Sequence, residues 1–374
     1  MILKKMKMED WFIKTSSCKY NFSESGVPDF TLTEFFKKIK VNKSILNNVF
    51  LGNNNTWGAL ELRKVIAGVY QNIKTDNLIV TNGTSEALYI FFNLFLTKKS
   101  KVFVLFPAFP ILYLIPQAYG AKVCLFDILK FKKSKETMLK SLLFEIKKTK
   151  PDLLIINIPH NPTGFTFSSK EIIEIGRVAQ SVKSTILFDE HYRFLPINDS
   201  ENILPSGYNI VSKFYNKVFA VGSIIKSTGI VGTRVGWLIG NRPDLNKIRD
   251  YKDYTTHCVS LVNETIAKLA IENIEKIMYE FISRIRNNWL LLKSSDLVKR
   301  KKIVLNYELE GGCVCFPKIN GFSSLKLAKL LASKYNISVM PGEAFDKKSY
   351  LRINLSQRIK YFKHLLKCIN QVIK

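Results

Sequence analysis

The stretch GSIIKSTGIVGTRVGW, residues 222–237, surrounds a single lysine, Lys226, with serines, threonines and four glycines. An arbitrary lysine is most often a solvated surface charge. In this stretch Ser223, Ser227 and Arg234 can bind phosphate oxygens, and the glycines allow the backbone to approach a ligand closely. A lysine beside an anion site favours a Schiff base with a phosphorylated aldehyde.

Outward from this stretch, short apolar runs alternate with longer helical patterns. This alternation is typical of βαβ units around a parallel sheet. It predicts an α/β fold in which a large domain holds a mostly parallel seven-stranded sheet between helices. The predicted strands are LIVT (78–81), VFVLF (102–106), KVCLF (122–126), LLIIN (153–157), TILFD (185–189), KVFAVG (217–222) and RVGWLIG (234–240).

The pattern changes after residue 243. Long helical stretches run to about residue 297 and are followed by short strands separated by helices, IVLNYEL, CVCFP, ISVM and YLRINL. This order predicts a smaller α+β domain joined to the large one by a long helix. We expect an N-terminal arm and part of the small domain over 1–44, the large domain over 45–270 and the small domain over 271–374.

The charge and the cysteines exclude several classes of protein. The net charge is +27, but only 11 of the 57 basic residues are Arg and the Lys are scattered, so no nucleic-acid partner is expected. Six Cys without C-x-x-C spacing and four His indicate neither a disulfide framework nor a metal site, and a reducing cytoplasm is expected.

No membrane partner is expected either. The first residues lack the apolar core of a signal peptide. Residues 102–119 are uncharged over eighteen positions, but three prolines interrupt them. Because proline breaks a membrane-spanning helix, this segment is interpreted as a buried strand, a turn and a short helix.

A phosphorylated aldehyde such as pyridoxal 5′-phosphate makes a further demand, a carboxylate held against its pyridine nitrogen. Asp189 ends the buried strand TILFD and can meet it, although an Asp that caps the turn is the alternative. Tyr192 can donate to the phenolic oxygen of the ring. Glu190 is interpreted as structural.

Two more strand ends carry polar groups. Asn161 in HNPTG (160–164) can also bind the phenolic oxygen, with a plain Asn-Pro turn as the alternative. Gly83, Thr84 and Ser85 in TNGTSEAL (81–88) present N–H groups and hydroxyls at a helix N-terminus, which suits a phosphate. An ordinary Ser/Thr N-cap is the competing interpretation.

Aromatic and basic residues complete the candidate site. Phe109 and Tyr113 follow a strand, where a ring could stack on the pyridine or simply pack in the core. Arg352 lies in the apolar strand YLRIN, where burial without an anion is costly. The α-carboxylate of a substrate would satisfy its guanidinium.

In this order the motifs TNGTSEAL, HNPTG, DEHY, GSIIKSTGIVGTRVGW and LRIN resemble the class I/II aminotransferase family of fold type I pyridoxal-phosphate enzymes, over about residues 45–358. The resemblance implies a catalytic Lys226 and an active site at a homodimer interface. It assigns the cofactor to Gly83, Thr84, Ser85, Phe109, Asn161, Asp189, Tyr192, Ser223, Lys226 and Arg234, and the substrate carboxylate to Arg352 and Asn161.

The chain departs from the family where the partner subunit usually donates a tyrosine to the phosphate. FLGNNNTWG (50–58) contains no Tyr, and of Phe50 and Trp57 only Trp57 could donate a hydrogen bond. This departure leaves open which residue takes the place of the tyrosine.

A narrower resemblance concerns EDWF (9–12), ESGVPDFTLTE (24–34) and YTTHCVS (254–260), which are similar to the capreomycidine and L-enduracididine synthases. These enzymes cyclise hydroxylated arginines. Gly26 would place an N–H near the substrate carboxylate, and Glu24 is the candidate partner of the guanidinium, although a solvent-exposed loop acid is the alternative. We therefore expect a cyclase, with a conventional aminotransferase as the first alternative. A DNA-binding regulator on the same fold is the second, and no added helix-turn-helix domain supports it.

Overall fold

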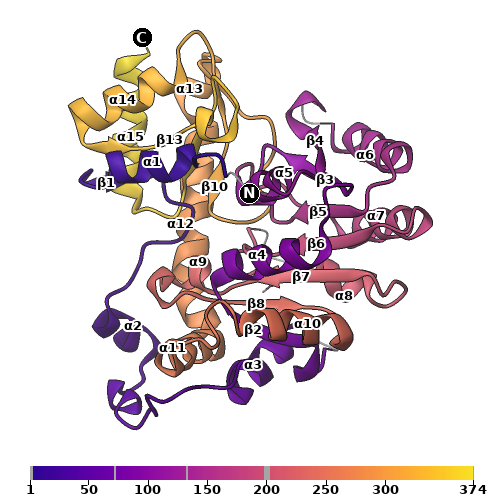
Figure 1. Ribbon diagram of the computed structural model, residues 1–374. Helices are drawn as coiled ribbons and strands as arrows, with labels where there is room; N and C mark the ends of the chain where they lie inside the picture. Colours follow the sequence, from indigo (N-terminus) through magenta and orange to yellow (C-terminus); the bar gives the residue numbers. More distant parts are fainter. Residues whose placement is uncertain (1–2, 71–72, 132–133, 198–202, 374) are drawn as a thin grey trace.

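A seven-stranded sheet forms the centre of the computed structural model, which describes residues 3–70, 73–131, 134–197 and 203–373 (Figure 1). The strand order is β2-β8-β7-β6-β5-β3-β4. The strands are β2 (Leu78–Asn82), β3 (Lys101–Phe106), β4 (Lys122–Asp127), β5 (Leu153–Asn157), β6 (Thr185–Asp189), β7 (Val218–Gly222) and β8 (Val235–Ile239). Each lies within a residue or two of a predicted run, so the predicted α/β sheet is confirmed.

The sheet is parallel except for β8, which pairs antiparallel with both β2 and β7. The register aligns the carboxyl ends of three neighbouring strands, since Asn157 pairs with Asp189 and Asp189 pairs with Val221. Polar residues that follow β5, β6 and β7 therefore meet at one edge, where open α/β sheets bind ligands.

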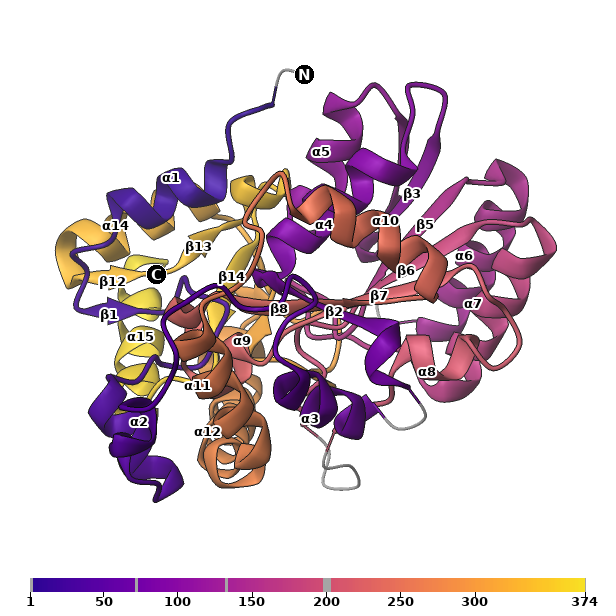
Figure 2. The same cartoon turned by 60° about the horizontal axis from the view of Figure 1, so that its bottom comes forward.

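Helices cover both faces of the sheet (Figure 2). Alternate residues of β2 point to opposite sides, because Ile79 packs with Phe91 and Ile248 while Leu78 belongs to the other core. One face carries α4 (Gly83–Phe95), α5 (Ile111–Ala118) and α10 (Arg242–Lys252), and the other carries α3 (Leu60–Tyr70), α6 (Lys135–Thr149), α7 (Ser169–Ser181) and α8 (Gly207–Val211). The strand, turn and short helix predicted over 102–119 are present as β3 and α5.

Three helices follow the sheet, as predicted: α10, α11 (Leu261–Glu272) and the 21-residue α12 (Ile274–Ser294). No helix in the described ranges is long and apolar enough to span a bilayer. A four-residue helix, α13 (Asp296–Lys299), precedes the small lobe. Beyond it α14 (Ser324–Tyr335) and α15 (Ile359–Val372) pack together, drawn in yellow in Figure 1.

The late strands are shorter than predicted. They are β9 (Ile303–Val304), β10 (Val314–Cys315), β11 (Lys318–Ile319), β12 (Ile337–Ser338), β13 (Met340–Pro341) and β14 (Leu351–Asn354). Between β9 and β10 the chain is not part of a strand, and its backbone N–H groups donate hydrogen bonds to the large lobe. Gly311 N donates to Gly164 O at 3.0 Å and Gly312 N to Leu195 O at 2.9 Å.

The N-terminal segment crosses to the small lobe. β1 (Tyr20–Asn21) pairs in parallel with β12, and α1 (Lys7–Lys14) packs against residues 342–345. Figure 2 shows α1 beside α14. Next along the chain, α2 (Leu32–Ile39) begins with a capping box of Thr31 and Glu34. The domain limits 44/45 and 270/271 stay a prediction.

Candidate functional site

A cavity of about 180 Å³ lies at the carboxyl edge of the sheet and contains Lys226. Most of the residues predicted for the cofactor line it together. They are Thr84, Ser85, Phe109, Asn161, Asp189, Tyr192, Lys226 and Arg234. Strand ends more than 140 residues apart in sequence thus converge on one cavity, as the parallel register requires.

Lys226 stands in the short helix α9 (Ile225–Thr228). Its Nζ lies 3.8 Å from the Glu24 carboxylate, and its backbone oxygen accepts a hydrogen bond from Val27 N at 2.8 Å. A Cβ added at Gly26 would lie 2.9 Å from Lys226 Cδ, so a larger residue there would displace the lysine. Both predicted N-terminal residues, Glu24 and Gly26, therefore lie against Lys226.

The beginning of α4 forms a narrow cradle with Arg234. Gly83 has φ +73°, and a Cβ there would lie 2.5 Å from an Arg234 terminal nitrogen. The N-cap residue Asn82 makes no side-chain capping bond, so the alternative of an ordinary N-cap does not hold. Thr84 and Ser85 are in the first turn and face the cavity. Free N–H groups, hydroxyls and a guanidinium here suit a phosphate.

YTTHCVS (254–260) contacts this same turn. Thr255 and Thr256 both donate to Glu86 Oε1 at 2.7 Å. Glu86 also accepts from Asn82 N at 2.6 Å. This motif therefore holds the first turn of α4 and does not line the cavity around Lys226.

Of the two serines near Lys226, Ser223 does not reach the cavity. Its hydroxyl donates to Val235 O at 2.8 Å and accepts from Ile225 N at 3.1 Å. The Ser227 hydroxyl is buried and has no partner among the described residues. Neither serine lines the cavity, but only the Ser227 hydroxyl lacks a protein partner in the described part of the chain.

Asp189 is 6% exposed at the end of β6. Burial raises the pKa of its carboxyl to about 7; the nearby Glu190 carboxylate adds to this, and the His191 N–H opposes it. A cationic group held against Asp189 would reverse this effect, since opposite charge favours the ionised form. Glu190 accepts from Ser206 Oγ at 2.8 Å and from Tyr208 N at 3.2 Å, which agrees with a structural role.

Arg352 is fully buried beside the cavity. Its Nη1 donates to Asn161 Oδ1 at 3.2 Å and its Nη2 to Ser23 O at 2.7 Å, while Nε has no partner in the described part of the chain. Burial lowers the pKa of this guanidinium, and Tyr192 and Glu24 oppose the shift. An anion within reach would complete its hydrogen bonding.

Of the two aromatic candidates after β3, Phe109 lines the cavity and Tyr113 does not. The Tyr113 hydroxyl donates to Asp346 at 3.3 Å instead. Neither residue suggested in place of the partner tyrosine lines the cavity: Trp57 stacks on Arg242, and Phe50 is 72% exposed.

Sequence reasoning noted EDWF in α1 as part of the resemblance but gave this helix no site residue. Met8, Glu9 and Phe12 line the cavity. The signal that could have found it is the amphipathic pattern of KMEDWFIK, in which Met8 and Trp11 are buried. His191 was also missed. Its Nδ1 is buried without a partner, and burial together with Lys226 and Arg234 lowers its pKa to about 3.

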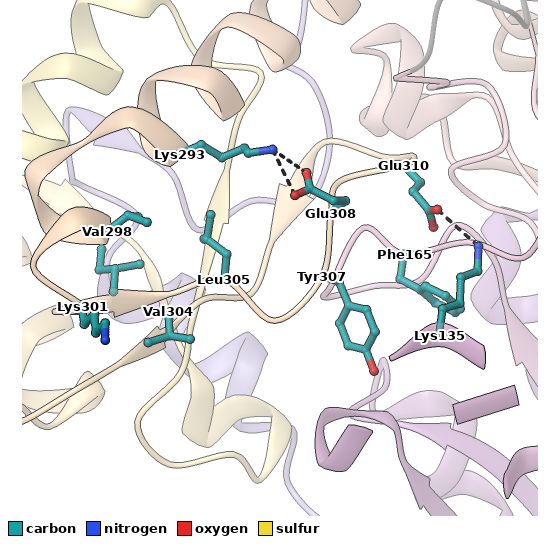
Figure 3. Close-up of a pocket in the computed structure, with 11 residues that line it drawn as sticks. Lys135, Phe165, Lys293, Val298, Lys301, Val304, Leu305, Tyr307, Glu308 and Glu310 are labelled. Atoms are coloured by element: carbon teal, nitrogen blue, oxygen red, sulfur yellow. Dashed lines mark hydrogen bonds and ion pairs between the residues drawn. The ribbon is translucent and has the colours of Figure 1, made fainter. Parts of the chain in front are cut away.

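A larger hollow of about 530 Å³ lies elsewhere, along residues 293–310 (Figure 3). None of the predicted site residues lines it. Figure 3 shows Lys293 pointing to Glu308 and Lys135 to Glu310, and these pairs lie 2.9 and 3.3 Å apart. Because four of its five charged side chains are paired with each other, this hollow offers less to a polar substrate than the cavity at Lys226.

The family model for aminotransferase class I and II matches residues 19–369. The chain belongs to this family. It is therefore an enzyme of the aminotransferase fold, and the cofactor of this fold is pyridoxal 5′-phosphate.

Curated relatives fall into two groups. Capreomycidine synthase of Streptomyces vinaceus is 22% identical over 356 residues, covering 93% of this chain and 88% of that protein. Aspartate aminotransferase of Thermotoga maritima is 25% identical over 343 residues, covering 90% and 86%. The two similarities are close in strength.

Solved structures divide in the same way. A PLP-dependent aminotransferase from Streptococcus suis superposes with a TM-score of 0.87 at 24% identity, covering 99% of this chain and 98% of the other. The PLP-dependent cyclase OrfR gives a TM-score of 0.87 at 20% identity, covering 100% and 98%. At these identities the likeness shows the fold, which is that of the PLP-dependent aminotransferases.

The residues present fit pyridoxal phosphate. The Gly83 cradle, Thr84, Ser85 and Arg234 would hold the phosphate, and the unpartnered Ser227 hydroxyl lies buried in α9, one residue after Lys226. The buried Asp189 would face the pyridine nitrogen. Lys226 would form the covalent bond, and the ring of Phe109 would lie against the cofactor.

Proposed function

We propose that this enzyme eliminates the hydroxyl group of a hydroxylated arginine and closes a cyclic guanidine. The product is a cyclic amino acid of the capreomycidine or enduracididine type. Similarity to capreomycidine synthase supports the proposal, but similarity to aspartate aminotransferases is equally strong. The cavity itself therefore has to discriminate between the two reactions.

The observation that carries the proposal is two carboxylates, one that lines the cavity and one that lies against Lys226. Glu9 lines the cavity from α1, and Glu24 Oε2 lies 3.8 Å from Lys226 Nζ. This is unexpected in a chain with 57 basic and 30 acidic residues. An aspartate substrate would bring a second carboxylate toward these acids, whereas a guanidinium would pair with them. The cavity thus favours a cationic side chain.

The chain's own residues can support each step. Arg352 and Asn161 would bind the α-carboxylate and orient Cα toward Lys226. When bound, pyridoxal phosphate supplies the electron sink that makes the Cα proton acidic. Lys226 Nζ takes that proton, and Asp189 keeps the pyridine nitrogen protonated.

Elimination then breaks the carbon–oxygen bond, and the hydroxyl group leaves as water after it gains a proton. A guanidine nitrogen of the same molecule forms the new carbon–nitrogen bond, which is favoured by high effective molarity. That nitrogen releases a proton, and a proton returns to Cα. The net change is the loss of one water, and no second substrate is required.

A conventional aminotransferase is the alternative, since it would use the same Lys226, Asp189 and Arg352. One incubation separates the two reactions. Purified holoenzyme is mixed with 3-hydroxyarginine or 4-hydroxyarginine, with and without a keto acid, and the products are read by mass spectrometry. Loss of one water with retention of the α-amino group, without a keto acid, supports the cyclase. Turnover only with a keto acid that gains the amino group contradicts it.

The carboxylate pair gives a second test. We expect Glu9→Gln and Glu24→Gln to raise KM for the hydroxyarginine by about tenfold each, because each removes one charge-assisted contact. Glu61→Gln is the matched control and should leave KM unchanged, because Glu61 is exposed on α3 and forms an ion pair with the neighbouring Lys64. Unchanged KM in both cavity variants would remove the basis for a cationic substrate.

We also propose that the enzyme acts in the cytoplasm as a homodimer. Large apolar side chains are exposed on two segments that touch each other, Phe50 and Leu51 on one and Tyr254 on the other. Lys252 Nζ donates to Thr56 O at 2.7 Å between these segments. Burial of this patch by a second copy would place that copy next to the first turn of α4. Light scattering during gel filtration tests the stoichiometry.

A further inference from the structure

Residues 23–30 connect the C-terminal region that contains Arg352 to the region that contains Lys226. We call them the connecting segment. The carbonyl oxygens of its first four residues all accept hydrogen bonds from side chains of the C-terminal region. Arg352 Nη2 reaches Ser23 O at 2.7 Å, and Cys313 Sγ reaches Ser25 O at 3.2 Å.

Asn354 holds the other two carbonyls. Its Nδ2 donates to Glu24 O at 3.0 Å and to Gly26 O at 2.7 Å. Its Oδ1 accepts from Ser356 N at 2.7 Å and from Ser356 Oγ at 2.6 Å. The amide is fully buried, and these bonds fix its orientation.

The second half of the connecting segment is bound to the lysine region instead. Val27 N donates to Lys226 O and Phe30 N to Gly229 O, both at 2.8 Å. Gly229 ends α9, the helix that contains Lys226. Glu24 and Gly26, which belong to the first set of bonds, both lie close to the Lys226 side chain.

We propose that Asn354 is a positioning residue for substrate binding. It lies two positions after Arg352 on β14, so both side chains point to the same face of the strand. Arg352 would bind the substrate carboxylate, and Asn354 fixes the backbone that presents Gly26 and Glu24. The two residues thereby keep the Arg352 guanidinium and the Glu24 carboxylate at fixed distances from Lys226. Asn354 does not line the cavity and is not itself a catalytic residue.

The inference rests on the proposed roles of Lys226 and Arg352, but not on which amino acid is converted. Asn354→Asp tests it, because it replaces the two donors with a carboxylate that faces two carbonyl oxygens. The loss of these bonds should release the connecting segment while Arg352 and Lys226 remain.

Asn288→Asp is the matched control. Asn288 is also fully buried, and its Nδ2 also donates to two carbonyls, Leu355 O at 2.8 Å and Gln357 O at 2.7 Å. Those carbonyls lie outside the connecting segment. A purely structural effect should therefore destabilise both variants, and only Asn354→Asp should affect substrate binding.

Two measurements are made on each holoenzyme. In the first, L-arginine and L-alanine are titrated against the visible band of the bound cofactor, and steady-state kinetics follow for whichever hydroxyarginine turns over. We expect Asn354→Asp to raise the half-saturation concentration and KM by about tenfold with kcat within about threefold. Asn288→Asp should leave both concentrations unchanged.

The second measurement is amide hydrogen exchange of residues 23–30, which needs no substrate. Exchange at these residues should be faster in Asn354→Asp and unchanged in Asn288→Asp. The proposal would be overturned if Asn354→Asp kept the wild-type exchange rate at residues 23–30 or the wild-type half-saturation concentration. It would also be overturned if both quantities rose equally in Asn354→Asp and Asn288→Asp. If Asn354→Asp does not fold, the same comparison is made with Asn354→Ser and Asn288→Ser.

The proposed function fails separately. If neither hydroxyarginine is converted in the wild type, the cyclase is wrong. The exchange measurement and the titration with L-alanine, which has no cationic side chain, still decide the role of Asn354.

Discussion

The two sides of the cavity at Lys226 are built differently. On the sheet side, Asp189 ends a buried strand, and Asn157 pairs with it across the ladder. On the N-terminal side, Glu24 and Gly26 are held by residues about 330 positions away in sequence. The first side is fixed by local motifs and strand register, and the second by long-range side-chain bonds.

The difference extends to charge. Lys226 and Arg234 line the cavity from the sheet side, whereas Glu9 lines it from the N-terminal side and Glu24 lies 3.8 Å from Lys226. We infer that the sheet side serves chemistry common to the family, while the N-terminal side determines which side chain is accepted. Relatives with different reactions can then share one fold, because a fold by itself does not fix a function.

Lys226→Ala should produce the largest effect, because it removes the central residue of the sheet side of the cavity. Turnover should fall at least about 1000-fold, because the nucleophile and base are lost together. After borohydride reduction and dialysis, intact mass spectrometry should detect a pyridoxyl adduct in the wild type and none in the variant. A covalent adduct of equal amount in Lys226→Ala would place the cofactor on another residue.

Arg352→Ala should rank next, because Arg352 joins the two sides through Asn161 and Ser23. We expect kcat/KM to fall by about 300-fold, as a buried charged hydrogen-bond pair is lost. Covalent loading of Lys226 should be retained. Steady-state kinetics with the best substrate checks the first expectation, and loss of less than about tenfold would contradict a carboxylate-binding role.

The sheet side was the predictable part. Gly83, Asp189 and Lys226 each stand in a short motif at a predicted strand end, and period-two apolar runs located those ends. The α1 contribution could not be predicted in the same way, since nothing local to Glu9 says that β1 will pair with β12. Ser223 was assigned from its motif, but its hydroxyl bonds Val235 O, a partner that only the antiparallel β8 supplies.

Asp189→Asn examines the electrostatics of the sheet side in cofactor-free protein. The pKa of Asp189 is raised from 3.8 to about 7, so between about pH 4 and pH 7 the folded state keeps a proton that the unfolded chain has released. Stability should therefore fall as pH rises through this window, by about 3 kcal/mol.

Urea unfolding from pH 4.5 to 8 measures this slope. Asp189→Asn cannot ionise, so it should lack this contribution and be more stable than the wild type at pH 8. A wild type that gains stability relative to Asp189→Asn as the pH rises would contradict the direction of the shift.

The smallest effect separates two serines of one motif. Ser227 Oγ is buried without a protein partner, whereas Ser223 Oγ makes two backbone bonds. Ser227→Ala should therefore weaken cofactor binding by about fivefold, the value of one hydrogen bond, with little change in the stability of the cofactor-free protein. Ser223→Ala should do the reverse and lower that stability by about 1 kcal/mol, because it removes the hydrogen bonds to Val235 O and from Ile225 N. Fluorescence titration with pyridoxal phosphate and thermal unfolding distinguish them. Equal loss of cofactor affinity in both variants would mean that Ser223 turns toward the phosphate when the cofactor binds, and the structural difference between the two serines would then not predict their function.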